Sequence, residues 1–196
     1  MNNSKRTFLK GLGLTLAISA AMGTAGLAQA AEKRSYILAT ASTGGTYYPV
    51  GVALATLTKV KLEPKHKLSL SAINSAGSGE NVKLLRENEA QFAIMQGLYG
   101  AWAWSGEGKV KESGPQKQLR SVSMLWQNVE QFVVKSKYVK SGNIDDLNGF
   151  KDVKFSIGKK NSGTEGSGRQ IMGGLGIDPN SFNLAYMGYG ASADAL

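Results

Sequence analysis

Residues 39–51, ATASTGGTYYPVG, restrict the fold of this chain more than any other stretch. An alternating apolar run over residues 35–41 leads into them, and an apolar-periodic run over residues 48–60 follows. This pattern predicts a strand, a loop and then a helix. The two glycines of the loop allow a sharp turn, and three hydroxyl side chains can cap the helix, those of Ser42, Thr43 and Thr46.

A helix that begins in this loop directs unpaired N–H groups and a partial positive charge beyond the end of the strand. Such a helix start can seat an anion or a carboxylate. The alternative is that the glycine-rich loop only closes a tight connection between strand and helix. The same arrangement recurs twice further along the chain, which favours a binding site.

Residues 67–73 and 91–96 show the patterns of two more strands. The first run leads into the small-residue loop of residues 74–81 and then a helix that ends near Asn88, and the second leads through glycine into a helix over 98–104. Three strands that each end in small or amide residues before a helix predict a parallel sheet. Ligands of such sheets sit beyond the carboxyl ends of the strands.

The strand–helix rhythm breaks after this region. Residues 105–116 are typical of a surface loop, and residues 119–126 and 131–135 then predict two strands with no helix between them. We interpret these strands as the crossing from one lobe to another. A short capped helical turn is expected over residues 141–147.

The rhythm resumes with a predicted strand over residues 153–157, a loop over 158–163 and a helix that begins at Thr164, next to the capping hydroxyl of Ser162. A Gly-Ile-Asp-Pro sequence ends this helix, and residues 182–187 predict the next strand. A further helix has barely begun at residues 191–196. We therefore expect that the chain is truncated.

The first thirty residues are typical of an export signal. A basic segment over residues 1–10 precedes an apolar, small-residue segment over 11–27, and Ala-Gln-Ala fits a cleavage site before Ala31. The segment SKRTFLK resembles a twin-arginine signal with Lys5 in the first arginine position, so the general secretory route stays open as well. Either route predicts a periplasmic protein, whereas the alternative is an uncleaved anchor.

Composition narrows the classes of function. The formal net charge is +9, and loss of the leader's cations leaves about +6. The remaining lysines are scattered among acids without an Arg-rich stripe, so we expect no nucleic-acid partner. The chain has no cysteine and a single histidine, His66 in a Lys-rich loop. We therefore expect no disulfide, metal site, cofactor or histidine-dependent catalysis.

Four motifs carry a family resemblance in order and spacing: TGGTYYPVG at 43–51, GSGEN at 77–81, AIMQ at 93–96, and SIG with SGTE at 156–158 and 162–165. From residue 36 to the end, the chain resembles the TAXI family, the extracytoplasmic solute-binding proteins associated with TRAP transporters. The resemblance implies an α/β fold of the two-lobe, type II periplasmic binding protein kind, with the second lobe incomplete in this chain. It implies a signal peptide over 1–30, a first lobe with crossing strands over 31–135 and part of a second lobe over 136–196.

The resemblance also implies a function. A small carboxylate such as glutamate or glutamine would be held between the lobes and delivered to the membrane permease of a tripartite ATP-independent transporter. Transferred position by position, the ligand-binding residues are Ser42, Thr43, Gly45, Thr46, Tyr47, Ser75, Gly77, Ser78, Asn81, Gln96, Ser162, Gly163 and Thr164. Neutral donors at helix starts suit a carboxylate, and an ammonium group would need acceptors such as Gln96 or Glu130.

The chain departs from the family in two loops besides its length. Residues 127–130, QNVE, stand where a Pro-containing segment is usual, and residues 159–161, KKN, stand where small residues are more usual. The first departure bears on any ligand-binding role of Glu130, because Glu130 belongs to the segment that differs. The second changes the charge of the loop.

Two other classes of function compete with transport. A secreted enzyme is disfavoured, because the Gly-Ser-Gly sequences lack the flanks of a nucleophile elbow, and the mature chain has no phosphate-binding lysine or complete dinucleotide loop. A periplasmic sensory protein that acts with a membrane sensor could use the same fold, because a fold does not fix function.

Overall fold

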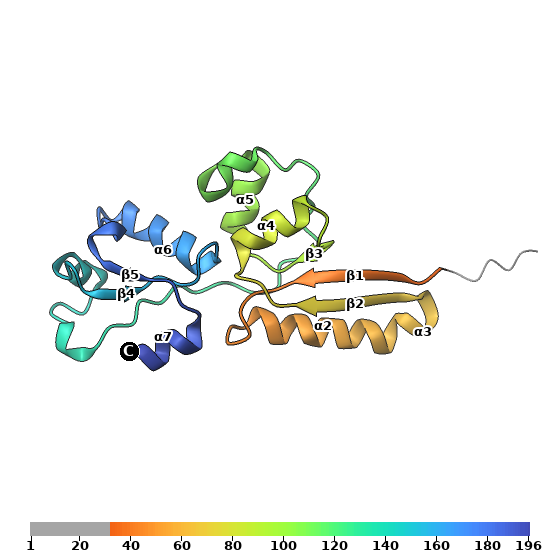
Figure 1. Cartoon of the computed structure of the whole chain (residues 1–196), viewed down its shortest axis with the longest axis horizontal. Helices are drawn as coiled ribbons and strands as arrows, with labels where there is room; N and C mark the ends of the chain where they lie inside the picture. Colours follow the sequence, from red (N-terminus) through yellow and green to blue (C-terminus); the bar gives the residue numbers. More distant parts are fainter. Residues whose placement is uncertain (1–31) are drawn as a thin grey trace, which may run out of the picture. The chain divides into compact units, whose positions relative to one another are not determined.

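The computed structural model describes residues 32–196 of the chain (Figure 1). The expected signal peptide over residues 1–30 and its cleavage site lie outside the described residues. Within residues 32–196, no helix combines the length and the apolar character that a membrane crossing requires.

The first three predicted strands form one parallel sheet. Strand β1 (Arg34–Ala39) pairs along its length with β2 (Leu68–Ile73) and at its end with β3 (Phe92–Ala93), in the order β2-β1-β3. The chain thus passes from the central strand β1 to β2 at one edge of the sheet, and then crosses to β3 at the opposite edge. In parallel sheets the crevice beyond the strand ends, where the order reverses, is the usual place for a ligand.

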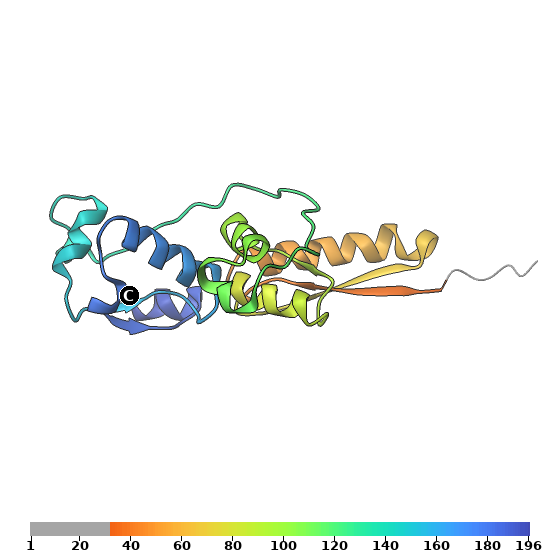
Figure 2. The ribbon, with the colours of Figure 1, turned by 90° about the horizontal axis from the view of Figure 1, so that it is seen from above.

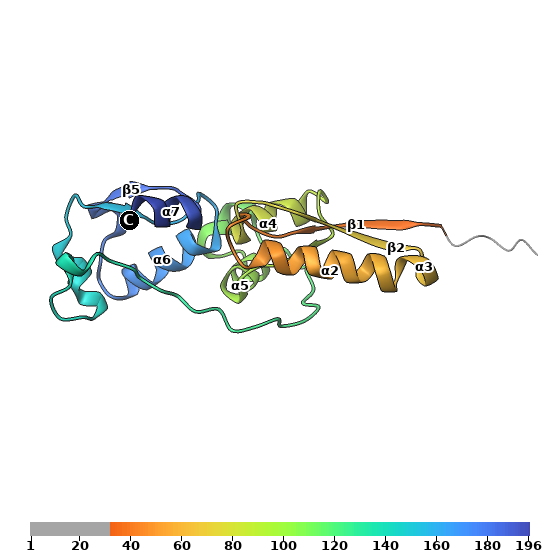
Figure 3. The ribbon, with the colours of Figure 1, turned by 90° about the horizontal axis from the view of Figure 1, so that it is seen from below.

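Helices follow the strands as the apolar periodicity predicts. They are α2 (Tyr47–Lys61), the short α3 (Glu63–His66), α4 (Ser78–Arg86) and α5 (Gly97–Ser105). Figures 2 and 3 show α2 and α4 on opposite sides of the sheet. Connections between parallel strands are right-handed, so a chain that winds to both edges of a sheet places its helices on opposite faces.

Gly51 lets α2 approach the sheet closely. A Cβ built on this buried glycine would collide with the side chain of Thr40 and would touch Leu38 and Ala72. Thr40 has no room to yield, because it is fully buried and its hydroxyl donates to the carbonyl of Ile73 at 2.6 Å. The helix therefore depends on a residue without a side chain at this position.

A second parallel sheet pairs β4 (Lys154–Ser156) with β5 (Asn183–Ala185). Helix α6 (Gly163–Gly174) joins the two strands, and α7 (Tyr189–Ala195) follows β5. The buried side chains of this region form one apolar core, which consists of Leu147, Phe150, Met172, Ile177 and Phe182. The predicted α/β class is thus confirmed as small parallel sheets joined by helices.

The two expected crossing strands are wrong. Within the described chain, residues 114–135 contain no strand, and Figure 2 shows this segment as an irregular thread. Many of its apolar side chains, including Val122 and Met124, are exposed, whereas Phe132 and Val134 pack against the apolar core of the second region. A strand needs a neighbour for its backbone groups, and the described sheets pair no strand with this segment.

Short 3₁₀ turns occupy the connections. They are η1 (Gly108–Ser113), η2 (Ser136–Tyr138), η3 (Ile144–Gly149) and η4 (Pro179–Ser181). The capped turn expected over residues 141–147 corresponds to η3, whose cap is Asn143. The Asn143 side chain accepts a hydrogen bond from the amide of Asp145 at 2.9 Å.

Replacement of Gly51 by alanine tests this packing. Alanine favours an isolated helix, but here its methyl group must displace buried Thr40, so we expect Gly51→Ala to destabilise the protein by about 1–3 kcal/mol. Gly173→Ala is the matched control, because a Cβ at Gly173 meets nothing within 4 Å. That variant should gain about 0.5–1 kcal/mol from helix propensity alone. Urea unfolding of both variants is the measurement, and equal changes would contradict the packing argument.

Candidate functional site

A cavity of about 480 Å³ lies where the strands end and the helices begin. Among residues 32–196, the N-cap residue of each α-helix except short α3 lines it, namely Thr46, Gly77, Gln96, Ser162 and Gly188. The first amides of a helix have no partner within the helix, and its start carries about half a positive charge. The lining therefore offers many N–H donors and a positive potential.

The structure brings most of the predicted site residues together around this cavity. Ten of the thirteen line it: Ser42, Gly45, Thr46, Tyr47, Gly77, Ser78, Gln96, Ser162, Gly163 and Thr164. They come from the loop after β1, the loop after β2, the end of β3 and the start of α6. Their contact with a ligand stays a prediction.

The other three predicted residues lie elsewhere. Thr43 is exposed, whereas Ser75 and Asn81 are buried and hydrogen-bonded to each other at 2.7 Å. The Asn81 amide donates to the carbonyls of Thr40 and Ile94 at 2.7 and 2.8 Å. Asn81 thus ties together the ends of β1 and β3, so it holds the loops that line the cavity.

The helix starts at Thr46 and Ser162 differ in their capping. Ser162 has an extended backbone, and its hydroxyl accepts a hydrogen bond from the Glu165 amide at 3.0 Å. Thr46 has a helical backbone, with φ −66° and ψ −31°, and makes no side-chain cap. A capping hydroxyl reaches the first turn only from an extended residue, so the expected side-chain cap at Thr46 is wrong.

Tyr47 supplies an amphipathic ring to the cavity. Burial, with smaller contributions from Tyr189 and Glu130, raises the pKa of Tyr47 to about 12. The hydroxyl therefore remains protonated, and available as a donor, throughout the physiological range. The ring packs edge-on against Trp126 with centroids 5.6 Å apart, whereas Tyr48 is not among the lining residues.

Gln96 is held firmly in the wall of the cavity. Its backbone amide donates to the Ser78 hydroxyl at 3.0 Å, and its side-chain nitrogen donates to a Glu130 carboxylate oxygen at 3.0 Å. A Cβ on Gly163 would come within 2.7 Å of the Gln96 side-chain oxygen, so only glycine permits this approach. That oxygen, Oε1, is buried and has no hydrogen-bond partner within the described part of the chain.

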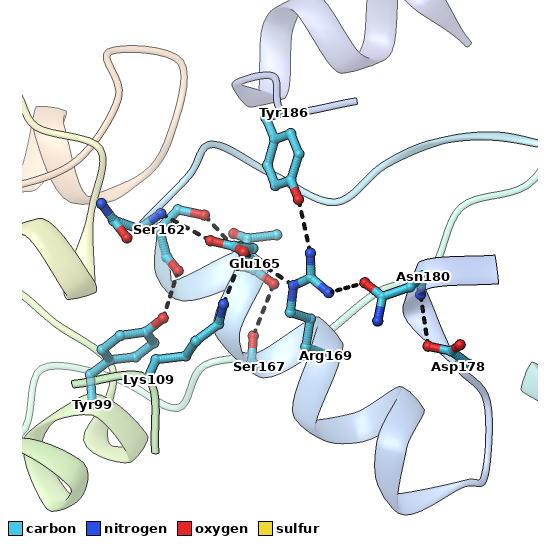
Figure 4. A network of polar contacts seen from close by, with 11 residues as sticks. Tyr99, Lys109, Ser162, Glu165, Ser167, Arg169, Asp178, Asn180 and Tyr186 are labelled. Atoms are coloured by element: carbon cyan, nitrogen blue, oxygen red, sulfur yellow. Dashed lines mark hydrogen bonds and ion pairs between the residues drawn. The ribbon is translucent and has the colours of Figure 1, made fainter. Parts of the chain in front are cut away.

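A second polar cluster fixes the start of α6 against the first half of the chain (Figure 4). Glu165, only 5 % exposed, accepts hydrogen bonds from Lys109 at 3.2 Å and Arg169 at 3.1 Å. The carbonyl of Asn161 accepts the amides of Gly79 and Glu80, both from α4, at 2.9 and 3.2 Å. These contacts set the position of the α6 start, which lines the cavity.

Two ionisation states support this docking. Burial alone would raise the pKa of Glu165, but the Asn161 amide and the cations Lys109 and Arg169 outweigh it, so its pKa lies below the ordinary value of 4.5. Burial, aided by the charge of Glu165, raises the pKa of Tyr99 to about 12. The Tyr99 hydroxyl therefore stays protonated and donates a hydrogen bond to the carbonyl of Ser162 at 3.1 Å.

Sequence reasoning missed several lining residues. Met187, Gly188 and Tyr189 follow β5, and the rule that ligands lie beyond strand ends, applied to the expected strand over residues 182–187, would have found them. Glu130, Lys159 and Trp126 also line the cavity; of these, the sequence analysis named Glu130 alone, as a possible acceptor for an ammonium group. The first two stand in the loops where the sequence departs from the TAXI pattern, and no local pattern marks Trp126 as a lining residue.

No cluster of three histidine, cysteine, aspartate or glutamate side chains suited to a metal ion occurs in residues 32–196.

A family model described as the NMT1-like family matches residues 38–196. The chain belongs to the NMT1-like family. This is a periplasmic binding protein-like family, whose members are binding proteins rather than enzymes and are typically extracellular or periplasmic.

Membership confirms the coarser expectations from the sequence. It supports an extracytoplasmic solute-binding role, with a small-molecule ligand and, in general, a membrane transporter as partner. The cavity described above, lined by helix starts and neutral donors, is a site of the kind that such a role requires.

The Glu165 cluster predicts a specific acid sensitivity. Because the folded pKa of Glu165 lies below 4.5, the unfolded state takes up the proton first as the pH falls. The stability that Glu165 contributes is therefore present above pH 4.5 and is lost as the pH falls through the folded pKa.

Glu165→Gln should lower the free energy of unfolding at pH 7 by about 1–3 kcal/mol. It should also lose less stability than the wild type on acidification below pH 4.5. Urea unfolding across this range is the measurement. Glu107→Gln, at an exposed position outside the cluster, is the control and should follow the wild-type curve. A Glu165→Gln curve parallel to the wild type would refute the role of the carboxylate.

Proposed function

We propose that this protein is a TAXI-type solute-binding protein that captures a small carboxylate, such as glutamate or glutamine, in the cavity between two lobes. The convergence of helix N-termini on one cavity is the observation that carries this proposal. Aligned N–H groups and helix dipoles favour negative charge without a buried counter-ion. Lys159, which also lines the cavity, adds a full positive charge.

The lining supports closure around the solute. Ser42, Tyr47 and Gln96 come from the region of the first sheet, and Ser162 and Thr164 come from the region of the second. A ligand in the cavity would complete contacts to both, and such contacts favour a closed arrangement of two lobes. We propose residues 31–135 and 136–196 as the parts that contribute to the first and second lobe.

The partner and the location follow from the same proposal. The TAXI resemblance of the four motifs favours delivery to the permease of a TRAP-type transporter. Export through the signal peptide proposed over residues 1–30 would place the protein beside that permease in the periplasm.

Thermal unfolding of the purified mature protein against amino acids, dicarboxylates, sugars and metal ions tests the proposal. A ligand of the native state stabilises it by about 2.7 kcal/mol at a hundredfold excess over its dissociation constant. We expect a selective rise of the midpoint with glutamate, glutamine or another small carboxylate. A rise with sugars or metals alone would show that the cavity binds a different class of solute.

Tyr47→Phe sharpens this test, because it removes one hydroxyl and keeps the ring that packs on Trp126. Loss of a hydrogen bond to a charged ligand should weaken binding of the effective carboxylate about tenfold to a hundredfold. Tyr138→Phe is the matched control, since Tyr138 packs on Phe150 and is not a lining residue. Equal effects of the two variants would place the ligand elsewhere.

A further inference from the structure

The outward face of α2 is apolar. Residues 47–58 contain no charged side chain. Buried Gly51 lies against the sheet, and the exposed positions on the other side of the helix form an apolar stripe that consists of Pro49, Val52, Ala53, Thr56, Leu57 and Val60. Leu57 and Val60 are 56 % and 61 % exposed. Residues three or four positions apart share one side of a helix, and on a surface helix that side is usually polar.

The stripe has little need of water. Its one polar side chain is that of Thr56, whose hydroxyl already donates to the carbonyl of Val52 at 2.9 Å. The other side chains offer only carbon atoms. Burial of such a surface is favoured in proportion to the apolar area that leaves water, and it leaves no unpaired donor behind.

Cations surround the last turn of α2. Lys59 and Lys61 stand on either side of Val60 in the sequence, and a rotation of about 100° per residue sends them to opposite flanks of the stripe. Residues at the start of β1, in α3 and just before β2 lie at the same end of the first sheet (Figure 1). We call the exposed cations of this end the basic end, which consists of Lys33, Arg34, Lys59, Lys61, Lys65 and Lys67.

The basic end has more cations than nearby acids can neutralise. The Arg34 amide donates to the carbonyl of Lys67 at 2.8 Å, which joins its two strands. Glu63 pairs with Lys33 at 2.6 Å. This hydrogen bond, aided by the charges of Lys33, Lys59 and Lys67, holds the pKa of Glu63 below its ordinary value of 4.5. One carboxylate thus serves several cations, and the others remain available to an anionic partner.

We propose that the α2 stripe and the basic end together bind the surface of a membrane that contains anionic phospholipids. The stripe lies in the headgroup layer, and Lys59 and Lys61 extend their ammonium groups to the lipid phosphates while their apolar stems cover the flanks of the helix. A second copy of the chain fits this surface less well, because residues 47–62 include no acid to meet the cations. An anionic bilayer supplies the apolar phase and the negative charge at once. The surface acts independently of the cavity, so the inference goes beyond the proposed function.

Co-sedimentation of the purified mature protein with lipid vesicles tests the inference. One set of vesicles is phosphatidylcholine alone, and the other is an equal mixture of phosphatidylcholine and phosphatidylglycerol. We expect binding to the mixed vesicles that weakens as the salt concentration rises, and much weaker binding to phosphatidylcholine. Equal binding to both sets, or no binding to the mixed set, would overturn the proposal. Dimerisation that Leu57→Gln abolishes, in a protein that ignores both sets, would assign the stripe to a second copy instead.

Two double variants then locate the surface. Lys59→Gln with Lys61→Gln should weaken binding to the mixed vesicles at least tenfold, because each lysine near an anionic surface contributes about fivefold. Lys151→Gln with Lys154→Gln is the matched control, since it removes the same charge at exposed positions outside the basic end. Equal losses in the two variants would show a diffuse attraction of a basic protein and would refute the basic end as the contact.

The apolar part needs its own pair of variants. Leu57→Gln with Val60→Gln keeps every charge and should weaken binding about tenfold, because it removes apolar area from the contact. Val122→Gln with Met124→Gln makes the same kind of change at exposed positions outside α2 and should bind like the wild type. Unchanged binding of the α2 variant would refute the part of the stripe. Urea unfolding of all four variants checks that these exposed substitutions leave the fold intact.

Discussion

Parallel pairing on both sides of β1 is the constraint on which the rest of the molecule depends. Parallel strands carry their carboxyl ends to one edge, so the loops after β1, β2 and β3 meet there. Each loop then starts a helix, which adds N–H donors to that edge. The buried Asn81 amide joins the ends of β1 and β3 and keeps these loops in register. A cavity suited to an anion follows from the topology before any single side chain is considered.

Small residues decide how closely the start of α6 approaches the first half of the chain. Gly163 lies against Gln96 and Ser78, and a Cβ on Gly166 would collide with Tyr99. Larger residues would push α6 away, and the Asn161 carbonyl would lose the α4 amides that it accepts. The Glu165 ion pairs then fix this contact electrostatically. The close packing that Gly163 and Gly166 allow and the ion pairs of Glu165 therefore both act at the start of α6.

The wall of the cavity departs from the rules that the rest of the fold obeys. Gln96 keeps a buried acceptor unpaired, and Glu130 lies on a segment without regular structure. Elsewhere in residues 32–196 the buried polar side chains are satisfied, as Thr40, Ser75 and Asn81 show. Such local conflicts in an otherwise consistent structure are typical of functional sites.

Sequence alone determined the local elements and the loops of the site. The predicted helix over residues 48–60 is α2, and the expected strand over 67–73 is β2, because periodicity reports which side of an element is buried. Tertiary structure decided which strands pair and which side chains form hydrogen bonds with one another. Residues 119–126 have an apolar pattern but no strand to pair with, and Ser75 faces Asn81 instead of the cavity. The Gln96 side chain donates hydrogen bonds to Glu130 and Ser167, which lie 34 and 71 positions further along the chain. Periodicity acts over one or two turns, whereas contacts at such separations exist only once the whole chain has packed.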